Sequence, residues 1–167
     1  MAQSTNFYFD MAYDKHPQEA GFYWADFVDM QDPFAFVPFD LYKSAEQTSM
    51  GHPLDPDSAF ADHVRLADSA QANSVGLQGQ LWSETLRSVD RMEYMAVPRL
   101  LSLAERAWSP QPDWATIEDR ERLQRRRATE WNAFANRLGQ RELPRLSRLD
   151  AEWTYRLPPP GAVVKEG

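Results

Sequence analysis

Two residues near the middle of the sequence, Trp82 and Glu84, could take part in chemistry. They follow a short apolar run in "GLQGQLWSETLRS" (76–88) that is typical of a buried strand. Trp82 could belong to the core, and Glu84 could begin a helix. Alternatively, the strand ends at the floor of a binding site, where an aromatic wall and a carboxylate acceptor are groups that can hold a sugar ring. The residues themselves leave both interpretations open.

A second candidate pair lies near the start of the chain, in "NFYFDM" (6–11). This run is short and rich in aromatic residues, so it predicts another buried strand. Because side chains alternate along a strand, the spacing predicts that Tyr8 and Asp10 point to the same face. Asp10 could equally cap the end of the strand. Trp24, in "GFYW" (21–24), is by residue type alone a core aromatic.

The element that carries Trp82 is predicted to be the strand "VGLQGQLW" (75–82), parallel to the first strand and beside it. The carboxyl ends of parallel neighbours meet at one edge of a sheet, so Tyr8, Asp10, Trp82 and Glu84 would gather there. The long stretch between the two strands is rich in Pro, Asp and aromatic residues. Connections of this length in compact domains are usually functional or carry small elements of their own.

Two helices are predicted after the second strand, which gives the alternation of an α/β protein. The first covers "YMAVPRLLSLAERAW" (94–108), with Pro98 near its start. The second begins at Asp113 or Thr116 and ends at Gly139. The apolar faces are Leu100, Leu101, Ala104 and Trp108 in the first helix, and Leu123, Trp131, Phe134 and Leu138 in the second. Two strands alone, however, make no stable sheet core.

Composition limits the classes of function that the chain can serve. Its 167 residues, 43% of them hydrophobic, suffice for one domain with a buried core. A chain with a formal net charge of -7 lacks the basic face that nucleic acid or an anionic membrane requires. No apolar run approaches the roughly 18 residues of a membrane span, and there is no cysteine for a disulfide or a thiol nucleophile. We therefore expect a neutral or polar ligand, and neither nucleic acid nor membrane as a partner.

The remaining charged residues give no separate site. His16, His52 and His63 show no ligand spacing, so we expect no metal. The arginines at 125–127 stand close to acidic residues at 118–121. This pattern is typical of a solvated helix face with ion pairs.

The motifs "NFYFDM", "GFYW", "GLQGQLWSE", "EYM", "PRLL" and "AERAW", in this order, resemble the end of the catalytic barrel of glycoside hydrolase family 20. This is the family of the β-N-acetylhexosaminidases, and its bacterial chitobiase branch is the most similar. The resemblance covers most of residues 6–160. It implies an α/β fold that is the C-terminal portion of a (β/α)8 TIM barrel, with the last two strands and the closing helices. The active site of such a barrel lies at the C-terminal ends of the strands.

The resemblance also implies a role for each candidate residue. Tyr8 would be catalytic, because the tyrosine hydroxyl of the family holds the acetamido oxygen of the substrate. Asp10 and Glu84 would accept hydrogen bonds from sugar hydroxyls. Trp82 would form the pocket around the N-acetyl group, and Trp24 would line the sugar-binding cleft.

The same resemblance implies the ligand and the compartment. The substrate would be an oligosaccharide that contains N-acetylglucosamine or N-acetylgalactosamine, no cofactor would be needed, and the protein would be periplasmic or secreted. In one respect the chain departs from the family. Ala25 follows Trp24 where the family often has Gly, which puts the path of this loop in question.

Catalysis in the family is substrate-assisted, so the acetamido oxygen of the substrate replaces a nucleophilic carboxylate. An adjacent Asp-Glu pair on the fourth barrel strand supplies the acid and steadies the acetamido nitrogen. In this chain, "EDR" (118–120) and "LDAEW" (149–153) follow no predicted strand. Asp10 and Glu84 could divide into acid and nucleophile, but the family roles argue against it. The isolated chain is therefore expected to lack the catalytic pair and to be inactive.

The resemblance predicts a division of the chain into two parts. Residues 1–155 would be the C-terminal fragment of the catalytic barrel, and residues 156–167 a tail leading to a missing C-terminal domain. The missing N-terminal part of the barrel would then be the partner of the chain. Three functions stay open: part of a β-N-acetylhexosaminidase, a non-catalytic carbohydrate-binding remnant, or a fragment without a function of its own, whose open sheet edges would be aggregation-prone.

Overall fold

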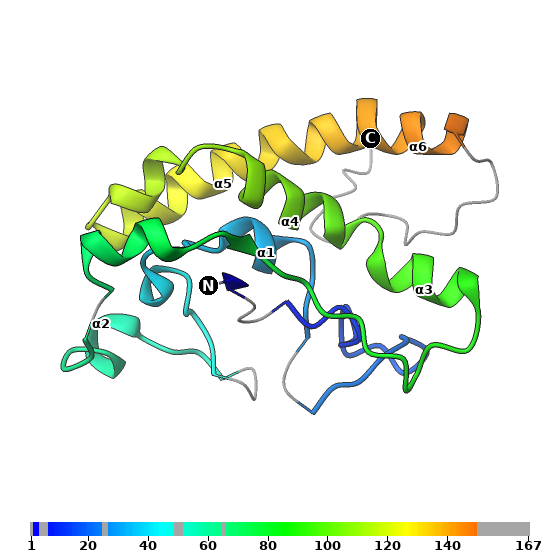
Figure 1. Ribbon diagram of the computed structural model, residues 1–167, viewed down its shortest axis with the longest axis horizontal. Helices are drawn as coiled ribbons and strands as arrows, with labels where there is room; N and C mark the ends of the chain where they lie inside the picture. Colours follow the sequence, from blue (N-terminus) through cyan, green and yellow to red (C-terminus); the bar gives the residue numbers. More distant parts are fainter. Residues whose placement is uncertain (1, 4–6, 25–26, 49–51, 65, 150–167) are drawn as a thin grey trace.

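The fold pairs a short strand from the start of the chain with a second short strand from its middle, and helices lie above the pair in Figure 1. The computed structural model describes residues 2–3, 7–24, 27–48, 52–64 and 66–149. Strands β1 (Ala2–Gln3) and β2 (Gly76–Leu77) pair in parallel, with Ala2 opposite Gly76. The predicted tail at 156–167, together with residues 150–155, lies outside the described residues.

The two predicted strand segments do lie side by side in parallel, but β1 precedes the strand predicted at 6–11, and β2 covers only the start of the strand predicted at 75–82. Past β1, Tyr8 pairs with Gln80 in an isolated parallel bridge. The Phe9 N–H donates to the Gln80 carbonyl at 2.6 Å, and the Gln80 N–H donates to the Phe7 carbonyl at 2.8 Å. The Met11 N–H then donates to the Tyr8 carbonyl at 3.1 Å, which closes a turn. Because this turn uses backbone groups that a longer ladder would need, the pairing of the two segments does not continue as a regular strand past Tyr8.

The long segment between the strands carries small elements of its own, as predicted. They are α1 (Gln31–Ala35), the 3-10 turn η1 (Leu41–Lys43), α2 (Pro56–Ala59) and the 3-10 turn η2 (Asp68–Asn73). Helix α2 begins after Asp55, whose side chain accepts a hydrogen bond from the Asp57 N–H at 3.2 Å.

The region after β2 forms two helices, α3 (Val89–Ala96) and α4 (Arg99–Trp108), where one was predicted. Ser88 caps α3 by accepting a hydrogen bond from the Arg91 N–H at 3.2 Å. Pro98 lies between the two helices. Because proline has no N–H to donate and its ring clashes with a preceding carbonyl, it cannot continue α3. The prediction that Pro98 lies near a helix start is confirmed, because α4 begins at Arg99, but residues 94–96 belong to a separate helix.

The longest helical unit runs through α5 (Arg120–Arg137), the π-helical turn η4 (Leu138–Glu142) and α6 (Leu143–Leu149), which we call the C-terminal rod. Figure 1 shows the rod along the top of the molecule. It begins after Asp119, whose carboxylate accepts a hydrogen bond from the Arg122 N–H at 2.7 Å. No helix in the described part of the chain is long and apolar enough to cross a membrane.

The ends predicted for this helix are wrong. Asp113 and Thr116 lie in a separate 3-10 turn, η3 (Asp113–Thr116), which precedes α5. Gly139 lies inside η4, and the helix continues past it because Leu138 and Leu143 on either side are buried and anchor the chain. Glycine permits the chain to leave a helix but does not require it.

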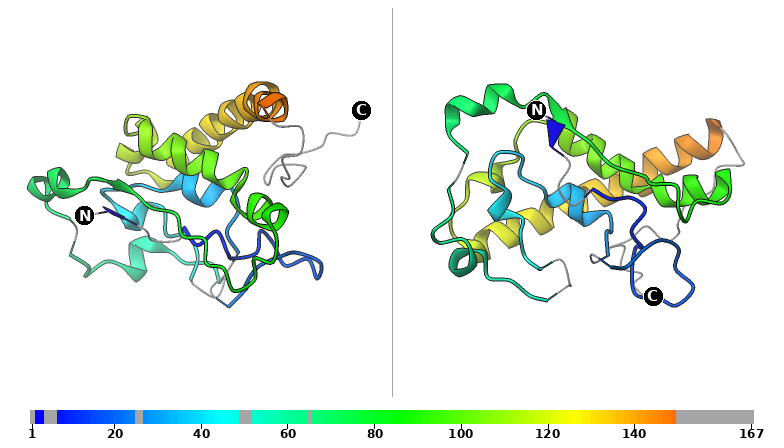
Figure 2. Two further views of the ribbon diagram at one scale, coloured as in Figure 1. Left: turned by 45° about the vertical axis from the view of Figure 1, so that its right-hand side comes forward. Right: turned by 60° about the horizontal axis from the view of Figure 1, so that its bottom comes forward.

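Three groups of buried side chains make the core. The first packs the Tyr8 segment against α4 and consists of Phe7, Phe9, Met11, Val28, Phe36 and Leu103. The second joins α1 to α5 and consists of Met30, Phe34, Trp131, Phe134 and Leu138. The third consists of Val37, Trp114, Ala115 and Leu123. The views in Figure 2 show α1 enclosed between α4 and α5, both of which it contacts. The apolar face predicted for the second helix is thus confirmed.

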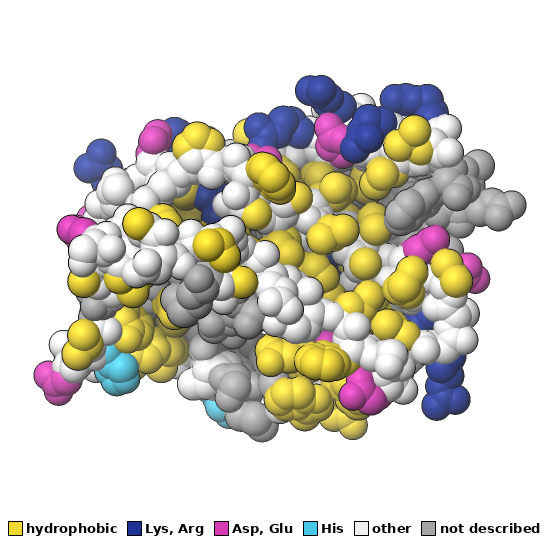
Figure 3. All heavy atoms as spheres, in the orientation of Figure 1, with side chains coloured by type: hydrophobic (Ala, Val, Ile, Leu, Met, Phe, Trp, Pro, Cys, Tyr) yellow, Lys and Arg dark blue, Asp and Glu magenta, His cyan; other side chains and the backbone are white. Residues whose placement is uncertain are grey.

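The apolar face predicted for α4 is wrong. Leu100 and Trp108 are exposed, and the buried positions are Arg99, Ser102, Leu103 and Arg106. The two arginines take the inward face because their guanidinium groups donate to backbone carbonyls of neighbouring segments, which offsets the loss of water. Figure 3 shows hydrophobic side chains gathered at the surface over α3 and α4.

Candidate functional site

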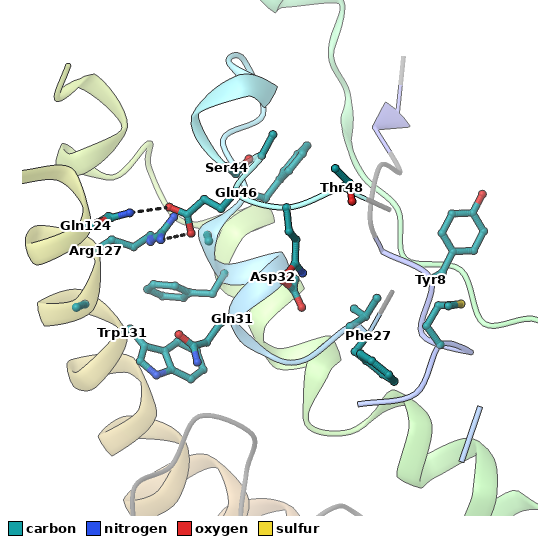
Figure 4. A pocket seen from close by; sticks show the side chains of 18 of the residues that line it. Tyr8, Phe27, Gln31, Asp32, Ser44, Glu46, Thr48, Gln124, Arg127 and Trp131 are labelled. Carbon is teal, nitrogen blue, oxygen red and sulfur yellow. Dashed lines mark hydrogen bonds and ion pairs between the residues drawn. The ribbon is translucent and has the colours of Figure 1, made fainter. Parts of the chain in front are cut away.

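A cavity of about 680 Å³ opens beside the turn that begins at Tyr8. Tyr8 and Trp24, two of the predicted site residues, line it together, and Trp24 is 63% exposed. Figure 4 shows Tyr8 and Phe27 on one side of the cavity and Arg127 and Trp131 of α5 on the other. Trp24 is therefore not a core aromatic, and its ring is accessible from the solvent.

Backbone pairing places the segment that carries Trp24 beside the first segment of the chain. The Phe22 N–H donates to the Asp10 carbonyl at 2.8 Å, and the Ala12 N–H donates to the Phe22 carbonyl at 2.7 Å. Gly21 makes this close approach possible. Its φ is 103°, and a Cβ there would lie 2.5 Å from the Asp10 carbonyl oxygen. Any other residue at this position would push the two segments apart.

Trp82 and Glu84 follow closely after Gln80, the residue that pairs with Tyr8. Trp82 is 54% exposed, and Glu84 is exposed as well. Helix α3 begins only at Val89, so Glu84 does not start it. The two purely structural interpretations of this pair are therefore wrong. Neither residue is among those that line the cavity beside Tyr8.

Asp10 lies in a different environment from Tyr8. Its side chain is only 2% exposed, and its Oδ1 atom has no hydrogen-bond partner among the described residues. Tyr8 lines the cavity and Asp10 does not, and the shared face expected for these two side chains stays a prediction. A buried acceptor that lacks a donor costs about 1–3 kcal/mol. A donor brought to Oδ1 would therefore be bound favourably.

Arg99, at the start of α4, is completely buried beneath these segments. Its Nη1 atom donates to the carbonyls of Met11 and Val28 at 2.8 and 2.9 Å, and its Nε atom donates to the Met95 carbonyl at 2.9 Å. Its Nη2 atom donates to the Phe9 carbonyl as well. Burial lowers the pKa of this guanidinium, while nearby phenol and carboxylate groups act in the opposite direction. One side chain thus binds the backbone on both sides of Asp10.

The far wall of the cavity is held by polar contacts around Glu46. Arg127 donates to its carboxylate at 2.7 Å and Gln124 at 3.4 Å, and Arg120 lies 3.6 Å from the same group. Figure 4 shows the first two contacts reaching from α5 to the segment at 44–48. Arg127 therefore fixes a wall of the cavity rather than facing solvent.

The other two arginines of the run at 125–127 form ion pairs on an exposed helix face, as predicted. Arg125 pairs with Glu121, and Arg126 lies 3.2 Å from Asp113, on the exposed side of α5. Within the described residues, no three His, Cys, Asp or Glu side chains are grouped so that they could hold a metal ion.

Asp29 and Asp32 are joined by a hydrogen bond at the start of α1, next to the cavity. The Gln31 N–H donates to Asp29 Oδ1 at 2.5 Å, and the Asp29 N–H donates to Asp32 Oδ2 at 2.7 Å. Burial raises the pKa of Asp29 above its ordinary value, although these hydrogen bonds and the charge of Arg99 oppose the rise. Folding therefore increases the proton affinity of the Asp29 carboxyl.

The catalytic-domain model of glycosyl hydrolase family 20 matches residues 1–111 of the 167. The match includes both candidate segments and the whole of α4. The chain belongs to glycosyl hydrolase family 20. The resemblance predicted from the motifs is therefore confirmed.

Relatives in family 20 match nearly all of this chain. The beta-hexosaminidase of Vibrio vulnificus is 33% identical over 179 residues, which cover 95% of this chain and 20% of that protein. The N,N'-diacetylchitobiase of Vibrio harveyi is 35% identical over 175 residues, which cover 96% of this chain and 18% of that protein. This chain therefore spans about a fifth of the length of the curated relatives that it matches.

A solved family 20 structure has the same fold over this region. The GH20 exo beta-N-acetylglucosaminidase from Vibrio harveyi, in complex with N-acetylglucosamine, aligns with a TM-score of 0.54 and 22% identity. The alignment covers 92% of this chain and 18% of that one. The chain thus has the fold of a portion of a family 20 catalytic domain. The described sheet has two short strands and no barrel. The assignment of this portion to the last two strands of the barrel therefore stays a prediction.

Sequence reasoning missed two residues that organise this part of the family 20 domain, Gly21 and Arg99. Both stand inside motifs that carried the resemblance, "GFYW" and "PRLL". A charged residue at the start of an apolar helix, directly after a proline, was the available signal for Arg99. The functional roles of the predicted site residues stay predictions: Tyr8, Asp10, Trp24, Trp82 and Glu84.

Proposed function

We propose that this chain is part of a β-N-acetylhexosaminidase, which hydrolyses terminal non-reducing N-acetylhexosamine residues of chitobiose-like oligosaccharides or glycoconjugates. Membership of family 20 supports the proposal, as do relatives named beta-hexosaminidase and N,N'-diacetylchitobiase. The observation that carries it is the backbone pairing of Tyr8 with Gln80. This pairing joins the two motif segments, and each leads to an exposed tryptophan, Trp24 or Trp82.

The chain would supply the groups that bind the sugar and its N-acetyl group. The exposed rings of Trp24 and Trp82 suit the apolar faces of a sugar, which aromatic side chains cover in carbohydrate sites. Asp10 offers an acceptor without a partner, and Glu84 offers an exposed carboxylate. Both groups can accept hydrogen bonds from sugar hydroxyls.

The reaction would be substrate-assisted and would retain configuration. The acetamido oxygen of the substrate forms a bond to the anomeric carbon while the bond from that carbon to the leaving oxygen breaks, and a glutamic acid protonates the leaving oxygen. Water then adds to the anomeric carbon and releases the acetamido oxygen. The Tyr8 hydroxyl would donate to the acetamido oxygen and hold it in line for the attack.

The acid step would need residues from another part of the domain. In these 167 residues no Asp is directly followed by Glu, the order of the family's catalytic pair. We therefore propose that residues 1–155 are the C-terminal part of the barrel and that the Asp-Glu pair belongs to a preceding part. Relatives about five times as long as this chain support that division.

A chimera would test the proposal. This chain would replace the matching region of the Vibrio harveyi N,N'-diacetylchitobiase, with which it is 35% identical. The chimera should hydrolyse a chromogenic N-acetylglucosaminide. Tyr8→Phe should lower kcat by about 10²- to 10³-fold, the usual effect of removing a hydrogen-bond donor that acts in the transition state. Trp82→Phe should mainly raise KM.

Trp108→Phe is the matched control, because Trp108 is exposed and lies at the end of α4, outside the two segments that carry the candidate site residues. It should leave both kinetic constants unchanged. A folded chimera that binds N-acetylglucosamine but gives no turnover would favour the non-catalytic carbohydrate-binding function. A folded chimera that neither binds nor hydrolyses would refute the proposal.

A further inference from the structure

We propose that Arg99 is a positioning residue, which fixes the segment of Tyr8 and Trp24 relative to the segment of Trp82 and Glu84. The sugar-binding roles of these four residues rest on the proposed function. The fixed geometry between the segments does not, because it follows from contacts of Arg99 with the backbone.

The first set of contacts holds the Tyr8 and Trp24 segment. Arg99 donates to the carbonyls of Phe9 and Met11, which flank Asp10, and to that of Val28, in the loop that follows Trp24. These three carbonyls lie far from Arg99 in sequence, and the Val28 N–H also donates to the Ala12 carbonyl at 3.0 Å, so the side chain and the backbone pairing hold the same junction. The guanidinium therefore ties the Tyr8 turn to the start of the cavity wall.

The second set of contacts reaches α3, the helix that follows the segment of Trp82 and Glu84. That segment is fixed at one end by the pairing of Gln80 and at the other by α3. The last turn of α3 carries Met95, whose carbonyl accepts a hydrogen bond from Arg99 Nε at 2.9 Å. Arg99 thus holds the C-terminal end of α3, the helix that follows the segment of Trp82 and Glu84, against the Tyr8 segment.

Tyr13 reinforces the same junction. Its ring lies over the guanidinium of Arg99, 3.9 Å from it to the ring centroid. Its hydroxyl, which has one proton to donate, lies 3.0 Å from the carbonyl oxygen of Tyr94 and 3.2 Å from that of Val97. The tyrosine and the arginine therefore bind the end of α3 from two sides.

Arginine is suited to this role in a way that lysine is not. Its planar guanidinium presents five N–H donors in fixed directions, so one side chain can serve several carbonyls at once. A lysine ammonium has three donors around one atom and no plane to stack on a tyrosine ring. Arg99→Lys should therefore keep the charge and lose part of the geometry.

Helix α4 also supplies a matched control. Arg106 is buried on the same face, and its Nε atom donates to the carbonyl of Phe34, in α1, at 3.2 Å. Its guanidinium lies 5.5 Å from the ring centroids of Phe34 and of Trp114. Arg106 therefore anchors α4 to the core beside α1, and Phe34 and Trp114 both lie outside the segments of Tyr8, Trp24, Trp82 and Glu84.

The experiment measures the distance between the two segments directly. The chain has no cysteine, so spin labels can be attached to the single pair created by Tyr23→Cys and Ser83→Cys, both at exposed positions. Pulsed electron–electron double resonance then gives a distance distribution. We expect one narrow maximum with Arg99 present, a broader or shifted distribution with Arg99→Met, and an intermediate one with Arg99→Lys.

Arg106→Met separates positioning from stability. It should lower the Tm, as Arg99→Met does, yet leave the distance distribution as narrow as in the parent chain. An unchanged distribution in Arg99→Met, or equal broadening in Arg106→Met, would overturn the proposal. Loss of the folded circular dichroism signal in both Arg99 variants would also overturn it, because the residue would then be required for folding alone. The measurement uses no sugar, so it stands or fails separately from the proposed activity.

Discussion

The Cα atom of Gly21 lies so close to Asp10 that a Cβ at Gly21 would be 2.5 Å from the Asp10 carbonyl oxygen. The same Cβ would lie 2.6 Å from Met95 Cε and 2.8 Å from the Ala12 nitrogen. Three elements of the site region therefore meet at a position where a side chain cannot fit.

Gly21→Ala should consequently destabilise the chain. The positive φ and the backbone clash together should lower the free energy of unfolding by about 1–3 kcal/mol, which urea titration followed by circular dichroism would measure. Gly139→Ala is the control, because nothing lies within 4 Å of a Cβ there and the residue is inside a helix. It should be neutral or stabilising by about 0.5–1 kcal/mol. Equal losses in both variants would contradict the crowding at Gly21.

Asp29 should make stability depend on pH. Burial raises the pKa of its carboxyl above the ordinary value of 3.8, so the folded chain binds this proton more tightly than the unfolded chain does. The resulting stabilisation is fully present below the unfolded pKa and is lost as the pH rises through the folded pKa. Asp29→Asn keeps an acceptor for the Gln31 N–H and should remove this loss. Unfolding midpoints measured from pH 3 upward would test it.

Asp55 gives the opposite sign and serves as the comparison. Hydrogen bonds from Ser58 and then from the Asp57 N–H lower the pKa of this exposed carboxyl. Its stabilisation is therefore present above its ordinary pKa and lost as the pH falls through the lowered value. Asp55→Asn should flatten the acid side of the profile and leave the Asp29 effect in place. If the two substitutions changed the profile in the same direction, the sign assigned to Asp29 would be wrong.

Two tryptophans close together in sequence should respond very differently to substitution. Trp114 has 0% exposure and packs with Val37 and Leu123, whereas Trp108 is 90% exposed. Trp114→Ala should cost about 3–5 kcal/mol through the lost contacts and the cavity left behind. Trp108→Ala should change the stability by less than about 0.5 kcal/mol. Thermal unfolding of the two variants side by side would show whether the third core cluster is placed correctly.

The 167-residue chain alone should not hydrolyse a chromogenic N-acetylglucosaminide. General acid catalysis contributes roughly 10²- to 10⁴-fold, and the family's Asp-Glu order does not occur in this sequence. Release of the chromophore would be followed with the purified chain and with its Glu84→Gln variant. Clear turnover that Glu84→Gln abolishes would mean that the roles of the residues have been assigned wrongly.

The parts of the fold that the sequence predicted correctly are those in which periodicity and burial agree. The α5 face of Leu123, Trp131, Phe134 and Leu138 is apolar at helical spacing and is buried. The segments of Tyr8 and Gln80 are short apolar runs, and they lie side by side. That these two segments, distant in sequence, are neighbours was indicated by the order of the family's motifs more than by local strand propensity.

The parts that could not be predicted depend on contacts distant in sequence. Periodicity assigns arginine to the outside of a helix. Arg99 and Arg106 are nevertheless buried, because carbonyl oxygens from other segments accept hydrogen bonds from their guanidinium groups. After the turn at Tyr8, Asp10 and Ala12 pair with Phe22, a contact between segments that strand propensity does not register. For the candidate site, the exposed positions of Trp24 and Trp82 were indicated only by the family resemblance, since residue type alone made Trp24 a core aromatic and left Trp82 open between the core and a binding site.

The C-terminal rod has a mechanical consequence. Its three helical parts are 18, 5 and 7 residues long and follow one another without a break. At 1.5 Å per residue the rod is about 45 Å long, so a tilt of about 5° at one end displaces the other by about 4 Å. Arg127 attaches the rod to Glu46 at the cavity wall. Because Leu138 and Leu143 hold the rod in the core, a tilt at the wall has to move this packing as well, and a fluorophore at the exposed Leu149 would report the displacement of the far end.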